Sequence, residues 1–299
     1  MSAEGRKETR TLRTVVRGLA QSLKESGIPS PGLEAHLLAA TVLDVSREEV
    51  LRAYDQEISY EALMKIEGLA ERRSRGEPMA YIRGLKEFWS LAFKVDRRVM
   101  IPRPETELLV DRCLRHAREK ARGRRLLALD VGTGSGAVAC AFAAELEDAL
   151  IIASDVSRDA LAVARENAGK LGLDHKIRFV LGGLLEPFRA GCDFDIMAAN
   201  LPYIPSGRLP LLPEGIRDYE PGLALDGGAD GLEVIRTLVA SARGHVGDGG
   251  ILALEVEDDQ VDMVIAMLKA AGGFGTIGID VDTAGFKRVV WAEKGGFGP

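Results

Sequence analysis

The second part of this chain alternates short apolar runs with stretches of helical periodicity, and this alternation restricts the possible folds most strongly. Stretches long enough for helices of about a dozen residues separate the first three runs, as parallel strands joined by crossover helices require. We therefore predict an α/β domain with a doubly wound, mostly parallel, Rossmann-like sheet. The expected strands are Leu126–Val131, Ile151–Ser154, Ile177–Val180, Phe194–Ala199 and Ile251–Val256, with a terminal pair at Thr276–Asp280 and Lys287–Ala292.

The first part of the chain has a different pattern. Residues 11–75 carry apolar residues at helical spacing, for example along the stripe from Leu12 to Leu23. Ser30, Ser46 and Ser59 each stand just before such a stretch, which is typical of helix N-caps. From Tyr81 the apolar period shifts toward two, which indicates a hairpin. The predicted domains are a small helical bundle at residues 1–80, a β-hairpin linker at 81–100 and the α/β domain at 101–299.

Composition and charge exclude several classes of protein. The net charge is -6 and the pI is about 5.5, so no global positive field attracts nucleic acid, and we expect no stable nucleic-acid binding. Three cysteines and four histidines are scattered without a metal-ligand spacing, so no metal site is expected. The polar start and the lack of an apolar run of about 20 residues predict a cytoplasmic protein without a membrane segment. We expect a monomer.

A glycine-rich loop, Asp130-Val-Gly-Thr-Gly-Ser-Gly136, lies where the first expected strand of the sheet ends and a helix begins. Its alternate glycines allow a tight turn and let a ligand approach the amide groups at the helix N-terminus. Asp155 ends the next strand, where its carboxylate can accept the ribose hydroxyls of an adenosine. The loop also satisfies the NAD fingerprint in its Gly/Ala form, so it does not by itself separate NAD from S-adenosylmethionine, and a turn that binds nothing also stays open.

A second motif, Asn200-Leu-Pro-Tyr203, directly follows the fourth expected strand, at the edge where ligands bind in such sheets. Methylation of a planar amide or aromatic amine requires two hydrogen-bond acceptors that face its two N–H bonds and direct the nitrogen lone pair. The Asn200 side-chain oxygen and the Leu201 carbonyl can be these acceptors, because Pro202 favours an extended, stiff turn. Tyr203 can stack on the flat acceptor group. A simple turn at the end of a strand is the competing interpretation.

The sequence resembles the HemK/PrmC family of glutamine methyltransferases that modify peptide chain release factors, from about Glu77 to Ala292. The stretches Lys86-Glu-Phe-Trp-Ser-Leu and Ile101-Pro-Arg-Pro-Glu-Thr-Glu107 are the most specific, because general methyltransferases lack them. The other similar segments are Asp130–Gly136, Asp155, Asn167, Asn200–Tyr203, Glu220-Pro221, Ala224-Leu225, Asp230-Gly231 and Gly285–Val290.

The resemblance implies a class I S-adenosylmethionine-dependent methyltransferase of translation termination, which methylates the N5 amide nitrogen of the glutamine in the GGQ motif of release factors. It also implies that the N-terminal bundle helps bind the release factor. The implied site has three parts. The catalytic residues are Asn200, Pro202 and Tyr203; the cofactor-binding residues are Gly132, Thr133, Gly134, Ser135, Gly136, Asp155, Leu184 and Asn200; the substrate-binding residues are Asn200, Leu201, Pro202 and Tyr203.

The chain departs from the family pattern at two positions. Leu201 stands where the family normally has proline, but only its backbone carbonyl is needed, so we expect activity to persist. Gly183 stands where an acidic residue often precedes the pair that covers the adenine, so we expect weaker recognition of the adenine edge, with Leu184 still covering the base.

Three other functions remain open on the sequence. A nucleic-acid adenine N6-methyltransferase would act on a similar planar nitrogen, but the acidic charge and the Pro-Arg-Pro-Glu-Thr-Glu segment argue against it. An NAD-dependent oxidoreductase would need a catalytic set that the second half of the chain does not offer: Tyr203, for example, has no lysine within four residues. A non-catalytic protein that only binds a partner is the third.

Overall fold

The computed structural model of this protein describes residues 10–120, 124–189 and 191–295, so the predicted polar start and the last residues lie outside the described part. The chain separates into two compact units. The helical unit comprises the chain up to Gly84 together with Glu214–Tyr219, and the α/β unit comprises Leu85–Pro213 and Glu220–Pro299. The segment after the fourth expected strand of the sheet therefore contributes residues to both units.

The helical unit follows the predicted pattern of apolar stripes and N-caps. Ser46 and Glu49 form a complete capping box, and the Ser59 hydroxyl accepts the Ala62 N–H, as their positions predict. Ser30 occupies the N-cap ahead of Pro31, but its side chain makes no capping hydrogen bond. The helices are α1 (Leu12–Glu25), α2 (Pro31–Leu43), α3 (Arg47–Arg52), α4 (Tyr60–Ser74), α5 (Met79–Arg83) and α9 (Glu214–Arg217). Extended structure was expected from Tyr81, but the chain there belongs to α5, which ends at Gly84 in the left-handed region.

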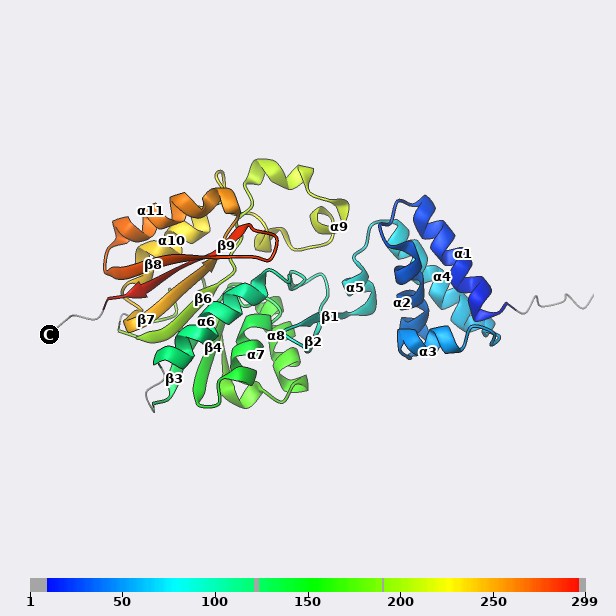
Figure 1. The fold of residues 1–299 in the computed structure, drawn as a ribbon, viewed down its shortest axis with the longest axis horizontal. Helices are drawn as coiled ribbons and strands as arrows, with labels where there is room; N and C mark the ends of the chain where they lie inside the picture. The colour runs from blue at the N-terminus through cyan, green and yellow to red at the C-terminus, as the bar shows by residue number, and fades with distance from the viewer. Residues whose placement is uncertain (1–9, 121–123, 190, 296–299) are drawn as a thin grey trace, which may run out of the picture. The chain divides into compact units, whose positions relative to one another are not determined.

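The α/β unit contains one seven-stranded sheet in the order β5-β4-β3-β6-β7-β9-β8. The first five of these strands are parallel, and β9 pairs antiparallel with both β7 and β8, so the predicted doubly wound, mostly parallel sheet is confirmed (Figure 1). The strands are β3 (Leu126–Val131), β4 (Ala149–Asp155), β5 (Ile177–Leu181), β6 (Phe194–Ala199), β7 (Val246–Glu255), β8 (Phe274–Val281) and β9 (Lys287–Lys294).

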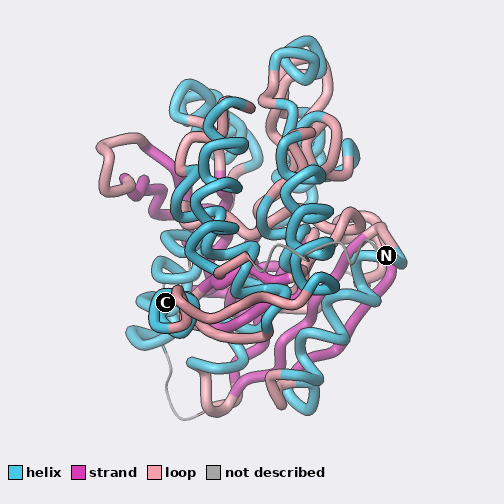
Figure 2. The backbone as a smooth tube through the Cα atoms, turned by 90° about the vertical axis from the view of Figure 1, so that its right-hand side faces the viewer, coloured by secondary structure: helices cyan, strands magenta, loops and turns pink. Residues whose placement is uncertain are grey.

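Helices cover both faces of this sheet, and Figure 2 shows the strands with the helices around them. Successive strand residues point to opposite faces. Ala128 and Ile196 therefore join one buried cluster with α6 and α7, while Leu129 and Met197 join another with α10 and α11. The helices are α6 (Thr106–Lys120), α7 (Ala137–Glu145), α8 (Arg158–Lys170), α10 (Glu233–Ala242) and α11 (Val261–Ala271). Near-continuous apolar strands are required where both faces are covered.

The expected hairpin is present as β1 (Leu85–Phe88) and β2 (Leu91–Lys94), but it is not a separate linker. Trp89 and Ser90 turn the chain with φ of 52° and 56°, the left-handed conformation that two-residue hairpin loops favour. Phe88 and Phe93 are buried in the cluster that includes α6 and α7. The hairpin is therefore part of the α/β unit.

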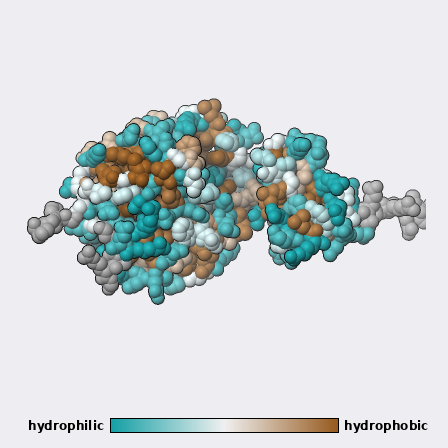
Figure 3. Space-filling view, in the orientation of Figure 1, coloured by the Kyte–Doolittle hydropathy of each residue, from teal (hydrophilic) through white to brown (hydrophobic). Residues whose placement is uncertain are grey.

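The face of the molecule shown in Figure 3 carries both polar and apolar residues. In Figure 3, apolar residues gather over α11 and β8, where Met263 and Ile279 are exposed. None of the helices in the described part of the chain combines the length and the apolar character that crossing a bilayer requires.

Candidate active site

A pocket of about 320 Å³ opens at the carboxyl ends of β3, β4 and β6, within the α/β unit. The chain order reverses between β3 and β6, and such a switch point is where ligands bind in open parallel sheets. The walls are formed by the glycine loop, the end of β4, the turn after β5 and the Asn-Leu-Pro-Tyr segment. Apolar residues from the hairpin region and from the segment after residue 220 complete them, among them Phe88, Val99, Met100, Pro102, Leu223 and Val234.

The glycine loop needs glycine at each of its three alternate positions, since Gly132, Gly134 and Gly136 have φ of 74°, 54° and 83°. The reasons for excluding a side chain differ, however. A Cβ on Gly134 would come no closer than 4.0 Å to any atom beyond its chain neighbours, so the space above it is open to a ligand. A Cβ on Gly136 would lie 3.1 Å from the Cβ of Ala164 in α8, so this glycine permits close packing of the loop on a helix.

Asp130 holds the glycine loop in place through its side chain. Its Oδ2 atom accepts hydrogen bonds from the Thr133 hydroxyl at 2.6 Å and from the Ala139 N–H at 3.1 Å. Burial raises the pKa of this carboxyl to about 7, although both hydrogen bonds act in the opposite direction. Asp130 thus occupies one amide in the first turn of α7 and joins the loop to that helix.

Asp155 ends β4 and lies across the pocket wall from the loop. Its carboxylate accepts the Gly134 N–H at 2.9 Å and the Ser157 N–H at 2.8 Å. Burial raises the pKa of the carboxyl above its ordinary value, while these backbone donors act against that shift. Asp155 thus ends the strand as predicted, and these hydrogen bonds hold its carboxylate beside the glycine loop.

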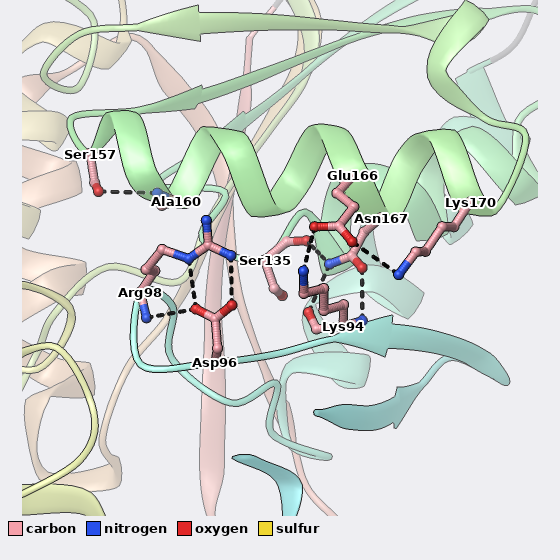
Figure 4. A network of polar contacts seen from close by, with 9 residues as sticks. All are labelled: Lys94, Asp96, Arg98, Ser135, Ser157, Ala160, Glu166, Asn167 and Lys170. Carbon is pink, nitrogen blue, oxygen red and sulfur yellow. Dashed lines mark hydrogen bonds and ion pairs between the residues drawn. The ribbon is translucent and has the colours of Figure 1, made fainter. Parts of the chain in front are cut away.

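Asn167 in α8 ties the loop to the hairpin (Figure 4). Its side-chain nitrogen donates to the carbonyls of Ser135 at 2.8 Å and Lys94 at 3.0 Å, and its oxygen accepts the Lys94 N–H at 2.7 Å. This side chain is fully buried, and every one of its polar groups is used. The hairpin therefore helps hold the glycine loop in place, and the hairpin and the loop belong to the same unit.

Asn200 presents a defined amide orientation to the pocket. Its Nδ2 atom donates to the Thr106 hydroxyl oxygen at 2.9 Å, and Asn200 and Thr106 both line the pocket. No described residue donates a hydrogen bond to the Asn200 Oδ1 atom or to the Leu201 carbonyl. Two oxygen acceptors of the Asn-Leu-Pro-Tyr segment are thus free for a ligand.

Behind Thr106 lies a buried carboxyl group, Glu255 at the end of β7, with a relative exposure of 2%. The Tyr203 hydroxyl donates to its Oε1 atom over a long 3.5 Å. Its Oε2 atom has no hydrogen-bond partner among the described residues. Burial raises the pKa of Glu255 to about 7.

The backbone of the Asn-Leu-Pro-Tyr segment is held from the side by a glycine-rich loop. Gln260 donates its Nε2 hydrogen to the Tyr203 carbonyl at 2.8 Å, and the Gly227 N–H donates to the Ile204 carbonyl at 2.9 Å. A Cβ on Gly231 would come within 2.3 Å of the Tyr203 carbonyl oxygen, so only glycine fits there.

The structure brings most of the predicted site residues together, and two lie elsewhere. The members that line the pocket are Gly132, Thr133, Gly134, Ser135, Asp155, Leu184, Asn200, Leu201 and Pro202. Gly136 packs on α8 instead, since it begins α7. Tyr203 does not line the pocket either: its ring packs in the cluster with α10 and α11, and its hydroxyl faces Glu255. The stacking of Tyr203 on a ligand stays a prediction.

Leu201 and Gly183 are the two departures from the family pattern, and Gly183 lines the pocket next to Leu184. The Leu201 side chain is buried, and a Cβ on Gly132 would lie 3.1 Å from its Cδ2 atom. Leu184 lines the pocket with φ of 45°, a conformation that a branched residue rarely adopts. Leucine at 201 thus fills space against the glycine loop.

Another segment on which the family resemblance rests, Pro-Arg-Pro-Glu-Thr-Glu, also connects to the pocket. Arg103 forms an ion pair with Glu220, whose other carboxylate oxygen accepts the Ile101 N–H at 3.2 Å. Burial raises the pKa of Glu220, and Arg103 acts against this shift. This ion pair holds in place the loop segment that contains Pro102 and Thr106, which line the pocket.

The sequence interpretation missed Thr106, Glu255 and Gln260 as parts of the site. Thr106 stood in a recognised segment without an assigned role. Glu255 offered one signal, a charged residue at the end of an apolar run that was expected to be a buried strand. Gln260 offered none, because only the fold brings it to the Tyr203 carbonyl.

Comparison with known proteins agrees with this geometry. The family model described as "Methyltransferase domain" matches residues 128–222. A solved methyltransferase from Pyrococcus furiosus is similar in fold, with a TM-score of 0.52 and 20% identity over 76% of this chain and 99% of that one. The sheet and its pocket define a class I S-adenosylmethionine-dependent methyltransferase.

The sequence comparisons are more specific. The model described as "PrmC N-terminal domain" matches residues 14–84. Release factor glutamine methyltransferase of Moorella thermoacetica is 38% identical over 95% of this chain and 99% of its own length, and that of Neisseria gonorrhoeae is 40% identical over 87% and 92%. This chain belongs to the release factor glutamine methyltransferase family.

Proposed function

We propose that this protein transfers a methyl group from S-adenosylmethionine to the side-chain amide nitrogen of the glutamine in the GGQ motif of a peptide chain release factor. The observation that supports this most directly is the orientation of Asn200. Its Nδ2 atom is engaged by Thr106, so its oxygen is left as an acceptor in a pocket that the glycine loop also lines.

The residues present fit the methyl donor. The open space above Gly134 admits a ligand close to the backbone, and Asp155 lies where it can accept ribose hydroxyls. Leu184 and the apolar walls suit the flat face of an adenine. When bound, S-adenosylmethionine supplies a methyl group on a positively charged sulfur.

The acceptor half of the pocket has to orient a poor nucleophile. An amide nitrogen is weakly nucleophilic because its lone pair is delocalised into the carbonyl group. Two acceptors, Asn200 Oδ1 and the Leu201 carbonyl, can hold the two N–H bonds so that the lone pair faces the donor. They also stabilise the positive charge that the nitrogen gains as the carbon–nitrogen bond forms and the carbon–sulfur bond breaks.

No general base is needed before the transfer in this scheme. The methylated, positively charged amide nitrogen is strongly acidic, so it releases one proton to water afterwards. Pro202 keeps Leu201 extended and stiffens the turn. Tyr203 supports this segment through its contact with Glu255.

The helical unit is the part we assign to release-factor binding. It matches the family model for the PrmC N-terminal domain, and it includes the segment Glu214–Tyr219, which follows the Asn-Leu-Pro-Tyr segment in the chain. The chain thereby passes between the two units three times, after Gly84, Pro213 and Tyr219. We infer a protein substrate, with no stable nucleic-acid binding, and a monomeric enzyme.

The decisive experiment incubates the full chain with a purified bacterial release factor and methyl-labelled S-adenosylmethionine, followed by mass spectrometry of the peptide that carries the GGQ motif. We expect one methyl group on the glutamine side chain and none with Asn200→Ala. Ribosomal RNA and DNA, offered under the same conditions, should stay unlabelled. Label in nucleic acid with an unmodified release factor would refute the proposal.

The cofactor assignment has its own test. S-adenosylhomocysteine should raise the thermal midpoint of the protein, while NAD at the same concentration should leave it unchanged. Stabilisation by NAD and not by S-adenosylhomocysteine would contradict this assignment and favour an NAD-dependent oxidoreductase.

A further inference from the structure

We propose that Glu186 is a cofactor-binding residue whose carboxylate accepts a hydrogen bond from the amino group on the adenine of S-adenosylmethionine. Glu186 thereby takes the place of the acidic side chain that position 183 lacks. The inference rests on the proposed function, because it assumes that the pocket holds the nucleoside of the methyl donor. It concerns how this chain recognises the cofactor and not the transfer step.

The strand order determines where the base of the methyl donor lies in the pocket. The methyl group has to face Asn200 after β6, the ribose faces Asp155 at the end of β4, and the strands follow the order β5-β4-β3-β6. Because neighbouring strands lie about 4.8 Å apart, the base extends away from Asn200 toward the end of β5. The turn after β5 lines this end of the pocket with Gly182, Gly183 and Leu184.

Two apolar side chains at this end of the pocket suit the flat faces of an adenine. Val156, which directly follows Asp155, lines the pocket and has a relative exposure of 57%. Leu184 lines the pocket as well, in the left-handed conformation. A bound ring would cover apolar surface on both side chains. Such contacts recognise the faces of a ring, but not the polar groups on its edge.

The turn after β5 folds back so that Glu186 lies against Gly183. The Glu186 N–H donates to the Gly183 carbonyl at 3.0 Å, and the following Pro187 favours an extended backbone at Glu186. Pro187 also packs on Gly182, where a Cβ would lie only 2.1 Å from the Pro187 Cγ atom. Position 182 therefore requires glycine, and this close contact holds the turn closed.

The Glu186 carboxylate occupies the region into which a side chain at position 183 would extend. A Cβ on Gly183 would lie 3.2 Å from the Glu186 Oε2 atom and 3.9 Å from its Oε1 atom. Gly183 itself lines the pocket. An aspartate at position 183 would hold its own carboxylate in the same region. The chain therefore presents a carboxylate there, although residue 183 has no side chain.

This carboxylate is available to a ligand. Glu186 is exposed, and no described residue forms a hydrogen bond or an ion pair with its side chain. An ionised carboxylate only accepts hydrogen bonds, and the amino group of adenine donates them. The two groups are therefore complementary, whereas a base with an oxygen in place of the amino group would bring acceptors together.

The experiment measures the Kd of two ligands by calorimetry: S-adenosylhomocysteine and its analogue with hydrogen in place of the adenine amino group. In the full-length protein, Glu186→Ala removes the carboxylate, and Glu186→Gln keeps a neutral acceptor. Glu186→Ala combined with Gly183→Asp moves the carboxylate to residue 183, whose φ lies outside the left-handed region. Glu147→Ala, at an exposed glutamate of the same unit, is the matched control for charge.

We expect the wild type to bind the analogue about tenfold more weakly than S-adenosylhomocysteine, because one hydrogen bond to a carboxylate is lost. Glu186→Ala should bind S-adenosylhomocysteine about tenfold more weakly than the wild type does, and it should no longer distinguish the two ligands. Glu186→Gln should distinguish them less than the wild type does. The combined variant should regain the preference for the amino group, and Glu147→Ala should behave as the wild type.

Several results would overturn the role of Glu186. Equal affinity of the wild type for the two ligands, or an unchanged preference in Glu186→Ala, would show that the carboxylate does not contact the amino group. The same loss in Glu147→Ala would assign the effect to net charge. A combined variant without the preference would show that positions 183 and 186 do not serve the same region.

Failure of the proposed function has a different signature. A release factor that stays unmodified, while the wild type still prefers the ligand with the amino group, would refute the proposed function alone. A wild type that binds neither ligand would refute both the proposed function and the role of Glu186.

Discussion

The burial of Glu255 predicts a particular dependence of stability on pH, and Glu255→Gln isolates it. The pKa of this carboxyl is raised from 4.5 to about 7, with desolvation as the largest cause. The folded protein therefore holds the proton more tightly than the unfolded chain does. The stabilisation from this group is fully present below pH 4.5 and is lost as pH rises through about 7.

The size of the effect follows from the two pKa values. Relative to low pH, this group lowers the free energy of unfolding by about 2 kcal/mol at about pH 6, where mainly the unfolded chain is ionised, and by about 3 kcal/mol at about pH 8.5, where the folded protein is ionised too. Glutamine at this position does not titrate. The stability of Glu255→Gln minus that of the wild type should therefore increase by about 1 kcal/mol between these two pH values.

The chain provides a suitable probe for this measurement. Both of its tryptophans, Trp89 and Trp291, belong to the α/β unit, so their fluorescence during urea unfolding reports the unit that contains Glu255. Comparing two variants at each pH cancels the contribution of Asp130, whose pKa of about 7 also makes the wild type pH-dependent. Glu147→Gln, at an exposed glutamate of the same unit, is the control.

A difference between Glu255→Gln and the wild type that does not change between these pH values would refute the reasoning. It would mean that the carboxyl titrates near its ordinary pKa in the folded protein, and hence that water reaches it. A difference that shrinks with rising pH would mean that the charged form is stabilised by its neighbours, against the direction that burial imposes. The same change in Glu147→Gln would assign the effect to general surface charge.

Three further predictions concern the walls of the pocket. Asp155→Ala should weaken S-adenosylhomocysteine binding by about tenfold or more, because an acceptor for buried hydroxyls is lost; calorimetry with unchanged affinity would contradict this. Gly134→Ala should weaken the same binding with a stability loss of about 1 kcal/mol, whereas Gly136→Ala should lose more stability, because its new Cβ also meets Ala164 at 3.1 Å; tryptophan-monitored urea unfolding that ranks them in reverse would refute it. Leu201→Pro should keep its kcat but lose about 1–2 kcal/mol of stability, since part of a buried side chain is removed; a strongly reduced kcat in folded protein would show that the loop geometry depends on leucine.

Much of the fold could be predicted because its signals are local. The parallel strands are buried on both faces, so the apolar runs mark them, and β3 and β6 begin and end at the expected residues. The capping box at Ser46 depends on residues three positions apart, so it too could be predicted from the sequence. Helix α5 was not, because its five residues are too few to show a period.

In the candidate site too, features that are local in the sequence could be predicted, and contacts between distant residues could not. The glycine loop and Asn200–Tyr203 each lie within a few residues of a strand end, so the fold class alone brings them to one edge of the sheet. Thr106 lies far from Asn200 in the sequence, and its contact depends on how α6 packs beside β6. The contact of Glu255 with Tyr203 likewise depends on how β7 pairs with β6. That Tyr203 does not line the pocket could not be predicted for a related reason: its adjacency to Asn200 does not show which side of the loop its ring occupies.

These contacts suggest why the acceptor loop tolerates leucine at position 201. Proline at this position would restrict the backbone intrinsically, but here the backbone is already held on both sides by other groups. Gln260 and the glycines around Gly231 fix the carbonyl of Tyr203, and Leu201 packs its side chain on the glycine loop. The orientation of the Asn200 side chain is in turn set by Thr106 and not by the loop itself. Rigidity of the acceptor thus comes from its buried supports, and we expect position 201 to need only a backbone carbonyl, which any residue can supply.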